Sequence, residues 1–335
     1  MRIVQQLDEH LWREFVDNHP QGNVFHTPEM FEVFDKAEGH RPMMWAAVDG
    51  DGRPLALLPA VQITLMGGLL HRLTTRAVAY GGILCAPGPE GTDALSALLE
   101  VYRREGTDGA LFTELRNLSD VSGLQPALKE SNFVYEDHLD YLIDLDRSPD
   151  DLLSSIGRRT RKNIRRGLRR GDVIMEEVKG QEGVDTCYDM LRRTYSSADV
   201  PLADKSLFEA TFDVLYPKNM VRFTVARVDQ AIVAISVELL YRDVVYGWYG
   251  GLDREYGAYV PNELLMWHIL EWSIENDYKV YDFGGAGKPD EEYGPRKFKA
   301  KFRGDLVCYG RNTCIHAPAL LQLSQWGYAA YRRFL

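Results

Sequence analysis

The sequence has little cysteine and no long apolar run. Its four cysteines form no Cys-x-x-Cys pair and have no histidine at a spacing typical of zinc sites, so we expect no bound metal. They are too few for a disulfide framework, which favours a reducing cytoplasm. No stretch approaches about 18 consecutive apolar residues, and the N-terminus carries acids where a signal peptide needs an apolar core. The sequence thus argues against an exported or membrane-spanning protein.

Basic residues are outnumbered by acidic ones. The chain has 39 Lys and Arg against 49 Asp and Glu, a net charge of −10. This balance excludes a protein whose whole surface binds nucleic acid, although a local basic patch remains compatible with it. With 45% hydrophobic and 26% charged residues in 335, the composition is that of a globular chain of about two domains.

Strand and helix patterns alternate through the first 145 residues. Met43–Val48 and Leu55–Thr64 are apolar, β-branched runs joined by Asp49-Gly50-Asp51-Gly52, which predicts a β-hairpin because glycine accepts the positive φ of such turns. Periodicity and caps predict three further elements: a strand over Arg2–Gln6 and helices over His10–Asn18 and Pro28–Ala37. The first part of the chain is therefore an αβ domain.

The same order of parts occurs twice. A second hairpin is predicted from Val221–Val228 and Ala231–Leu240, and each hairpin leads into a Tyr-Gly-Gly, at Tyr80–Gly82 and at Tyr249–Gly251. The first copy is longer, with its extra residues around Met66–Arg72. This pattern indicates two related αβ units in tandem, because loop growth of that kind is tolerated.

A strongly cationic segment opens the second half. Ser148 and Pro149 predict a helix start, and its continuation over Arg158–Arg170 holds eight basic residues in thirteen. One narrow apolar stripe is expected to pack, formed by Leu152, Ile156, Ile164 and Leu168. The cations, Arg158 and Arg161 among them, form either a solvated face or a contact for a phosphate-rich partner such as tRNA or a nucleotide-linked precursor.

Two further stretches hold candidate site residues. Arg254–Asn262 leads into a helix over Pro261–Asn276, whose N-terminus suits an anion, but it holds a single glycine and is a poor phosphate cradle. Over Tyr281–Phe302, a short strand ends in two glycines, and we expect Phe298-Lys299 to open a second strand. That edge gathers Asp282, Arg296 and Lys299.

Together these segments resemble the Fem-type aminoacyltransferases, which comprise two GNAT-like domains. The resemblance rests on GGLDREYGAYVPNELLMWHILEWSIENDYKVYDFGG with KFKAKF, and on DLLSSIGRRTRKNIRRGLRRGDVIMEE. It implies an α/β (α+β) fold in which each domain is a central mixed sheet flanked by helices. The first domain would span 1–145, with the helix of 317–335 packing back on it, and the second, carrying the transferase site, 146–316. The sequence has no long helical-hairpin insertion, and in this it is similar to the compact FemX-like members of the family.

The sequence also departs from the family pattern. Bridge-forming members tend to carry Asp-Pro at the end of a first-domain strand, whereas the corresponding stretch here is Phe112–Asn117. An arginine common after the threonine of the helix near Met190 is absent, since Thr194 is followed by Tyr195. These differences leave the acceptor open.

Individual residues can be given candidate roles, of which that of Lys299 comes from the resemblance and the others from their positions in the sequence pattern. Lys299 matches the lysine of the Phe-Lys motif and would stabilise the oxyanion or the leaving oxygen, because a lysine at its usual pKa stays charged. Asp282 would accept a proton or orient the amine, or else form a structural ion pair. The expected substrate contacts in the two domains are Tyr80, Glu114, Arg116, Arg158, Arg161, Tyr246, Tyr249, Asn262 and Arg296.

Three functions are compatible with the sequence. The first is transfer of an amino acid from aminoacyl-tRNA to an amine of a peptidoglycan-precursor peptide, which implies charged tRNA and a nucleotide- or lipid-linked peptide as partners and no tightly bound cofactor. The second is an acyl-CoA-dependent N-acyltransferase, and the third a non-catalytic polyanion binder. The C-terminal segment with Trp326, Tyr328 and Tyr331 is expected to dock on the first domain, with a peripheral membrane contact as the alternative.

Overall fold

The computed structural model describes residues 1–107, 109–198 and 200–334, apart from the side chains of Leu69 and of residues 328–334. Tyr328 and Tyr331, named above, therefore have side chains outside the described residues. The chain divides into two units, Met1–Asp137 with Tyr309–Leu335, and His138–Cys308. Both divisions lie eight residues before the expected ones at 145 and 316.

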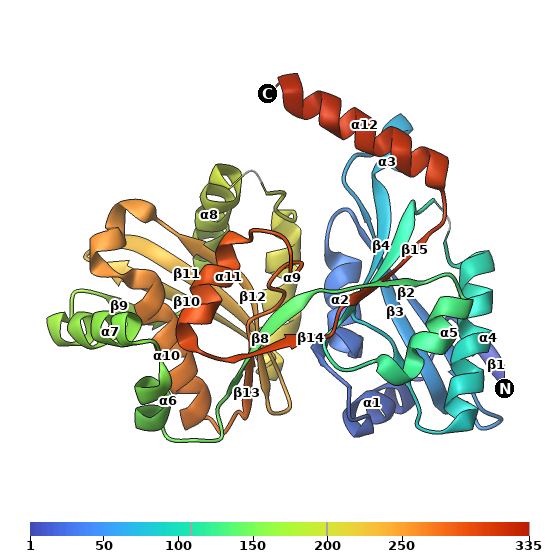
Figure 1. The fold of residues 1–335 in the computed structure, drawn as a ribbon, viewed down its shortest axis with the longest axis horizontal. Helices are drawn as coiled ribbons and strands as arrows, with labels where there is room; N and C mark the ends of the chain where they lie inside the picture. Colours follow the sequence, from blue (N-terminus) through green and yellow to red (C-terminus); the bar gives the residue numbers. More distant parts are fainter. Residues whose placement is uncertain (108, 199, 335) are drawn as a thin grey trace. The chain divides into compact units, whose positions relative to one another are not determined.

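Unit 1 is a mixed sheet with helices on both faces (Figure 1). Helices α1 and α2 pack on one face and α4 and α5 on the other. The strands are β1 (Arg2–Val4), β2 (His40–Val48), β3 (Pro54–Thr64), β4 (Thr75–Gly81), β5 (Leu84–Cys85), β6 (Phe112–Asn117), β7 (Val134–Glu136) and β15 (Arg311–Ile315). The helices are α1 (Glu9–Asn18), α2 (Pro28–Lys36), α3 (His71–Thr74), α4 (Pro89–Glu105), α5 (Gln125–Glu130) and α12 (Pro318–Phe334).

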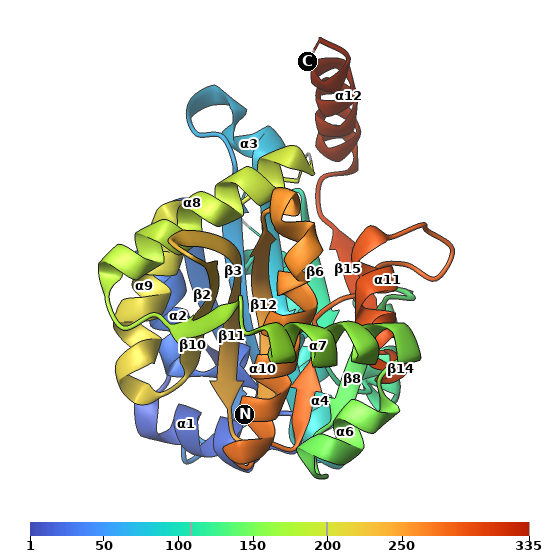
Figure 2. The same cartoon turned by 90° about the vertical axis from the view of Figure 1, so that its left-hand side faces the viewer.

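Unit 2 repeats this layering. Helices α6, α7 and α10 belong to the core on one face of its seven-stranded sheet, and α8 and α9 pack on the other (Figure 2). The strands are β8 (Leu139–Asp144), β9 (Ile174–Glu177), β10 (Val221–Val228), β11 (Ala231–Tyr241), β12 (Val244–Leu252), β13 (Val280–Asp282) and β14 (Asp305–Cys308). The helices are α6 (Pro149–Ser155), α7 (Arg158–Arg170), α8 (Gln181–Ser197), α9 (Lys205–Leu215), α10 (Pro261–Glu275) and α11 (Gly294–Lys299).

The two sheets have the same strand order. Sheet 1 runs β1-β2-β3-β4-β6-β15-β7, and sheet 2, read from its β9 edge, runs β9-β10-β11-β12-β13-β8-β14. In each sheet one central pair is parallel, β4 with β6 and β12 with β13, and its neighbours are antiparallel. The predicted tandem repeat is thus confirmed. The strand beside β7 is β15, from the far end of the chain, whereas β8, which follows β7 in sequence, lies in the sheet of unit 2.

Local predictions from turn and cap chemistry are confirmed. β2 pairs with β3, and β10 with β11, as antiparallel hairpins. Thr27 caps α2 by accepting the amide of Met30, and Ser148 caps α6 by accepting the amide of Asp151 at 3.2 Å. These helix starts could be predicted from the sequence because each capping side chain accepts a helix-end amide that lies within four residues of it.

Two local predictions are wrong. Phe298-Lys299 lies in helix α11, which continues into the 3-10 helix Ala300–Phe302, and not in a strand. The rings of Phe298 and Phe302 pack at 5.3 Å across one helical turn, which favours the helix. The cationic helix is not continuous with its start, since Ile156 takes an extended conformation between α6 and α7. Leu168 leaves the expected stripe and is 55% exposed.

Candidate active site

The parallel pair β12/β13 ends abruptly. Its register runs only from Val244 opposite Val280 to Tyr246 opposite Asp282. Beyond Asp282 the chain turns at Gly284, whose φ of +65° is left-handed and favours glycine. A Cβ at Gly284 would also lie 3.1 Å from the hydroxyl oxygen of Tyr246. Gly284 and Tyr246 therefore lie in close contact at this strand end.

A bulge in β12 brings the two predicted tyrosines to one face. Tyr246 lies opposite Leu239 and Tyr249 opposite Val237, because the register shifts by one residue between them. Without the shift, residues three apart would face opposite sides of the sheet. Tyr249 packs against Phe208 of α9 at 4.8 Å between ring centroids. Tyr246 and Tyr249 thus share the face covered by α8 and α9.

Lys299 reaches this strand end from α11. Its ammonium nitrogen donates to the carbonyl oxygens of Phe283 at 2.7 Å, Gly284 at 2.6 Å and Gly285 at 2.9 Å. An ammonium has three donors, so all three go to backbone carbonyls. Burial lowers the pKa of Lys299, while the charges of Asp140 and Asp282 act to raise it.

Arg296, one turn earlier on α11, continues the same pattern. Its guanidinium donates to the carbonyl oxygens of Ala286 at 2.7 Å, Pro289 at 3.1 Å and Lys288. The remaining carbonyl, of Gly287, accepts the amide of Leu139 at 2.9 Å. Every carbonyl from 283 to 289 therefore has a donor, and we call this segment the pinned loop.

Two buried carboxyl groups lie beside Lys299. Asp282 is 4% exposed and accepts the amide of Gly284 at 2.7 Å. Asp140 of β8, 5% exposed, hydrogen-bonds to Asp282. Burial raises the pKa of Asp282 well above its usual value, and the charge of Asp140 raises it further. We therefore expect the two joined carboxyl groups to share one proton, so that the pair carries about one negative charge opposite the ammonium of Lys299.

Sequence reasoning missed Asp140. It lies more than a hundred residues before its partners and follows no motif used above. A signal was present, since an aspartate inside the strand pattern Leu139–Asp144 is unusual for a residue depleted in strands.

A second unpredicted acid lies under α10. Glu238 of β11 is fully buried, and its Oε1 accepts the hydroxyl of Ser236. Its other oxygen has no hydrogen-bond partner among the described residues. Burial raises the pKa of Glu238 from 4.5 to about 8, with the Ser236 hydrogen bond and the charge of Arg222 acting against the shift.

The predicted residues of unit 1 form their own cluster. Arg116 lies opposite Tyr80 in the parallel register, with its guanidinium carbon 5.0 Å from the Tyr80 ring centroid. Glu114 accepts Arg116 at 2.6 Å and Arg311 of β15 at 3.2 Å. Burial alone would raise the pKa of Glu114, but the two arginines outweigh it and the pKa is lowered. Tyr80, Glu114 and Arg116 are thus brought together.

The remaining predicted residues lie elsewhere in unit 2. Arg158 is exposed, and Arg161 donates to the Ser154 carbonyl. Both belong to α7, which packs on α10, on the sheet face opposite Asp282. Helix α7 approaches closely because a Cβ at Gly167 would lie 2.6 Å from Leu264. Asn262 is half-buried in the first turn of α10.

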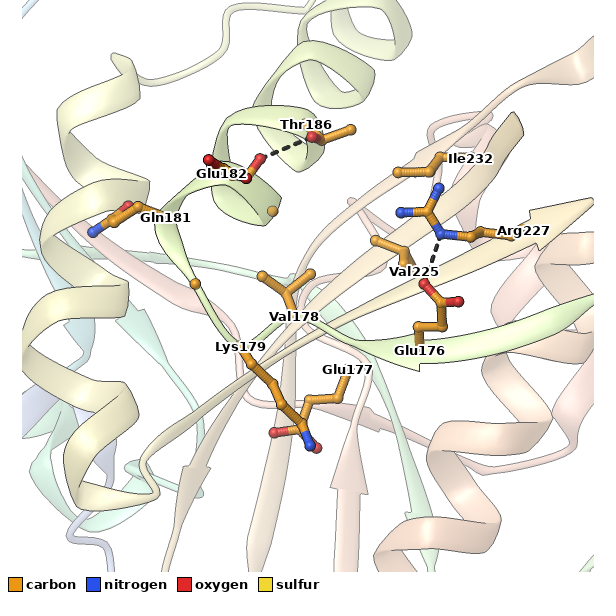
Figure 3. Close-up of a pocket in the computed structure, with 12 residues that line it drawn as sticks. Glu176, Glu177, Val178, Lys179, Gln181, Glu182, Thr186, Val225, Arg227 and Ile232 are labelled. Carbon is orange, nitrogen blue, oxygen red and sulfur yellow. Dashed lines mark hydrogen bonds and ion pairs between the residues drawn. The ribbon is translucent and has the colours of Figure 1, made fainter. Parts of the chain in front are cut away.

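One hollow of unit 2 lies away from this chemistry. It measures about 370 Å³ and lies between β9 and the start of α8, at the sheet edge opposite β14 (Figure 3). Figure 3 shows Arg227 directed at Glu176, 2.6 Å away. Its charged lining is thus already paired in part, and it contains none of the predicted site residues.

Two further kinds of feature are not found in the described part of the chain. Across the described ranges, no cluster of three or more His, Cys, Asp or Glu side chains could hold a metal ion. Likewise, none of the helices in the described part is long and apolar enough to cross a bilayer.

Comparisons with known proteins point to one family. A GNAT acetyltransferase domain profile matches residues 155–295. Lipid II:glycine glycyltransferase of Staphylococcus aureus strain N315 is 22% identical over an alignment of 373 residues, covering 85% of this chain and 86% of that protein. The match to the strain COL enzyme, also 22% identical, covers 63% of this chain and 65% of that enzyme.

Solved structures agree on the fold. The crystal structure of FemX has a TM-score of 0.73 at 17% identity, covering 96% of this chain and 99% of that one. A tandem GNAT protein from the clavulanic acid biosynthesis pathway has a TM-score of 0.60 at 12% identity, covering 95% and 99%. These matches confirm the resemblance seen in the sequence motifs and the predicted fold class. The chain is an acyltransferase related to the Fem-type aminoacyltransferases, with two GNAT-like units in tandem.

Proposed function

We propose that this protein transfers an amino acid from an aminoacyl-tRNA to an amine of a peptidoglycan-precursor peptide, linked to a nucleotide or a lipid. The observation that carries the proposal is the share of the chain that aligns with the related enzymes. The alignment with lipid II:glycine glycyltransferases covers 85% of the chain and so includes both units, not the acyltransferase unit alone. The lipid-linked form of the precursor is proposed because those relatives act on lipid II.

The choice of donor rests on the surroundings of α10. A coenzyme A pyrophosphate needs several free amides, yet the segment entering α10 has one glycine, Gly257, and Pro261 removes the first helical N–H. Close by, α7 crosses the start of α10, and Arg170 stacks on Tyr259 at 5.2 Å. Clustered cations and few cradle amides favour a long polyanion over acyl-CoA, which remains the second candidate.

The chemistry asked of the site is modest. A neutral amine attacks the ester carbonyl, a C–N bond forms, the C–O bond to the ribose breaks, and the proton of the amine ends on the leaving oxygen. Negative charge grows on the carbonyl oxygen during this step. We assign Lys299 to the electrostatic stabilisation of this oxygen through its positive charge, since its three donors are taken by backbone carbonyls. Asp282 and Asp140, being buried, position Lys299 in this proposal and do not touch the substrate.

The direct test is a transfer assay. Incubation of the pure protein with charged tRNA and a nucleotide- or lipid-linked muropeptide should give a product heavier by one amino-acid residue, measured by mass spectrometry. Consumption of acetyl-CoA with charged tRNA ignored would establish the second candidate instead.

Replacing Lys299 by Met tests the assigned residue. We expect at least about a 100-fold loss of kcat, because one charged stabiliser of an oxyanion contributes about that much. Lys297→Met is the matched control, since Lys297 lies in the same helix, is exposed and pairs with the exposed Glu292. Near-normal turnover by the folded Lys299→Met variant would refute the assignment.

A further inference from the structure

Unit 1 carries two elements that have no counterpart in unit 2. The β3–β4 connection spans Leu65–Thr74 and includes α3, whereas β11 and β12 are joined by Arg242 and Asp243 alone. Helix α12 follows β15, while the equivalent strand of unit 2, β8, leads into α6. The two additions pack together, with the Ser324 hydroxyl donating to the Leu73 carbonyl at 2.6 Å (Figure 1).

These additions expose apolar side chains on a scale unusual for this chain. Six of its fifteen exposed large hydrophobic side chains lie on them, in the part of the chain whose side chains the structure describes. Trp326 is 66% exposed and Leu323 51%. We call the six the apolar cap, formed by Leu65, Met66, Leu70, Leu320, Leu323 and Trp326. Exposed large apolar side chains gathered on two elements that pack together are typical of an interaction surface.

The charge around the apolar cap is equally distinctive. Although the chain holds 49 acidic residues, none occurs from Gly52 to Pro89 or from Leu306 to Leu335. The basic residues of these acid-free stretches include Arg72 of α3, which is exposed. The surroundings therefore favour a negatively charged partner over a second copy of this net-acidic chain.

We propose that the apolar cap docks on a lipid bilayer that contains anionic headgroups. An exposed tryptophan beside leucines suits the interfacial layer, and nearby cations suit the headgroups. The two elements supply a protruding loop and a helix that are additions to the repeated fold, so the sheet does not need them. The inference goes beyond the proposed transfer and is measurable without donor or acceptor.

The experiment measures binding of the full chain to vesicles. We expect cosedimentation with vesicles of equimolar phosphatidylcholine and phosphatidylglycerol, and weaker binding to phosphatidylcholine alone. Tryptophan fluorescence should be quenched by bromine-labelled lipid. Leu323→Ser/Trp326→Ser should lower the partition coefficient at least about tenfold and remove most of the quenching, because both side chains supply the inserted area. Arg72→Glu should weaken binding only to the anionic vesicles.

Leu168→Ser is the matched control. Leu168 is 55% exposed among the arginines of α7, so it tests whether any exposed leucine beside cations gives the same result. We expect the control to bind like the parent, and all variants to keep the parent unfolding midpoint. No vesicle binding by the parent, or equal loss in the control, would overturn the proposal. The proposal would also be overturned if the Leu323→Ser/Trp326→Ser variant still bound vesicles but no longer associated with itself, because the apolar cap would then contact a second copy of the chain.

Discussion

At the scale of single residues, Lys299 and the two buried aspartates form one cluster of interacting charges. Lys299 directs its three donors to the pinned loop, and the Asp140–Asp282 pair supplies the opposite charge. Neither aspartate is available as an exposed base. The motif alone identified Lys299 and Asp282, but the sharing of a proton depends on Asp140, which local sequence did not single out.

Replacing Asp282 by Asn tests the shared proton. Asparagine mimics the protonated carboxyl and can still accept the Gly284 amide, so the unfolding free energy should change by less than about 1.5 kcal/mol. Asp140→Asn/Asp282→Asn should cost about 3 kcal/mol or more, since it leaves the Lys299 charge without a counter-charge. Urea unfolding at pH 7 measures both. Additive small effects in the double variant would contradict the shared-proton pair.

Glu238 makes a separate prediction about pH. Its pKa is raised in the folded state to about 8, so the folded protein holds a proton that the unfolded chain has lost above about 4.5. The free energy of unfolding should therefore fall as pH rises from about 4.5 to about 8. Glu238→Gln should flatten that slope. Thermal unfolding over this range, with the exposed Glu9→Gln as control, measures it, and an unchanged slope would count against the assignment.

At the scale of elements, local chemistry predicted most pieces and failed where tertiary contacts decide. The hairpins and caps are encoded within a few residues and were predicted correctly. Helix α11 was read as a strand because Phe-Lys-Ala-Lys-Phe alternates like one. The four-residue spacing of Phe298 and Phe302 was the competing signal, and packing of Phe302 on Phe283 at 5.8 Å favours it.

Helix α7 gives the prediction at this scale. Arg165→Glu/Arg166→Glu reverses two exposed charges, so it should weaken tRNA binding and reduce its salt dependence, by about one unit of slope for each phosphate that the helix no longer neutralises. Folding should be unaffected because neither side chain is buried. Filter binding at several salt concentrations measures this.

The control for α7 is the double variant Arg103→Glu/Arg104→Glu, which reverses two neighbouring charges on α4. Both of its side chains are also exposed on a helix. Equal weakening by the two pairs would mean that overall charge, and not α7, determines binding.

At the scale of the whole molecule, the C-terminal segment belongs to unit 1 because its strand β15 pairs within the sheet of that unit. Strand β15 lies between β6 and β7, with Asn312 fully buried and Cys314 3% exposed. The Asn312 side chain also donates to Gln125 at 2.8 Å. A chain that ends before β15 leaves two strands without their shared neighbour.

Deleting residues 309–335 should therefore abolish cooperative folding of unit 1, because buried ladder groups lose their partners. Deleting 318–335 removes α12 alone and should leave that transition in place. Calorimetry and limited proteolysis distinguish the two. A preserved unit 1 transition in the longer deletion would show that β15 is dispensable.

The sequence by itself determined the hairpins, the helix caps, the tandem repeat and the cationic segment, because each depends on residues close together in the chain. Only the tertiary structure decided that Asp140 adjoins Lys299 and that β15 completes unit 1. It also showed that Tyr246 and Tyr249 share a face through a bulge. Strand neighbours and register arise from pairing between distant segments, and local periodicity carries no record of which segment the partner will be.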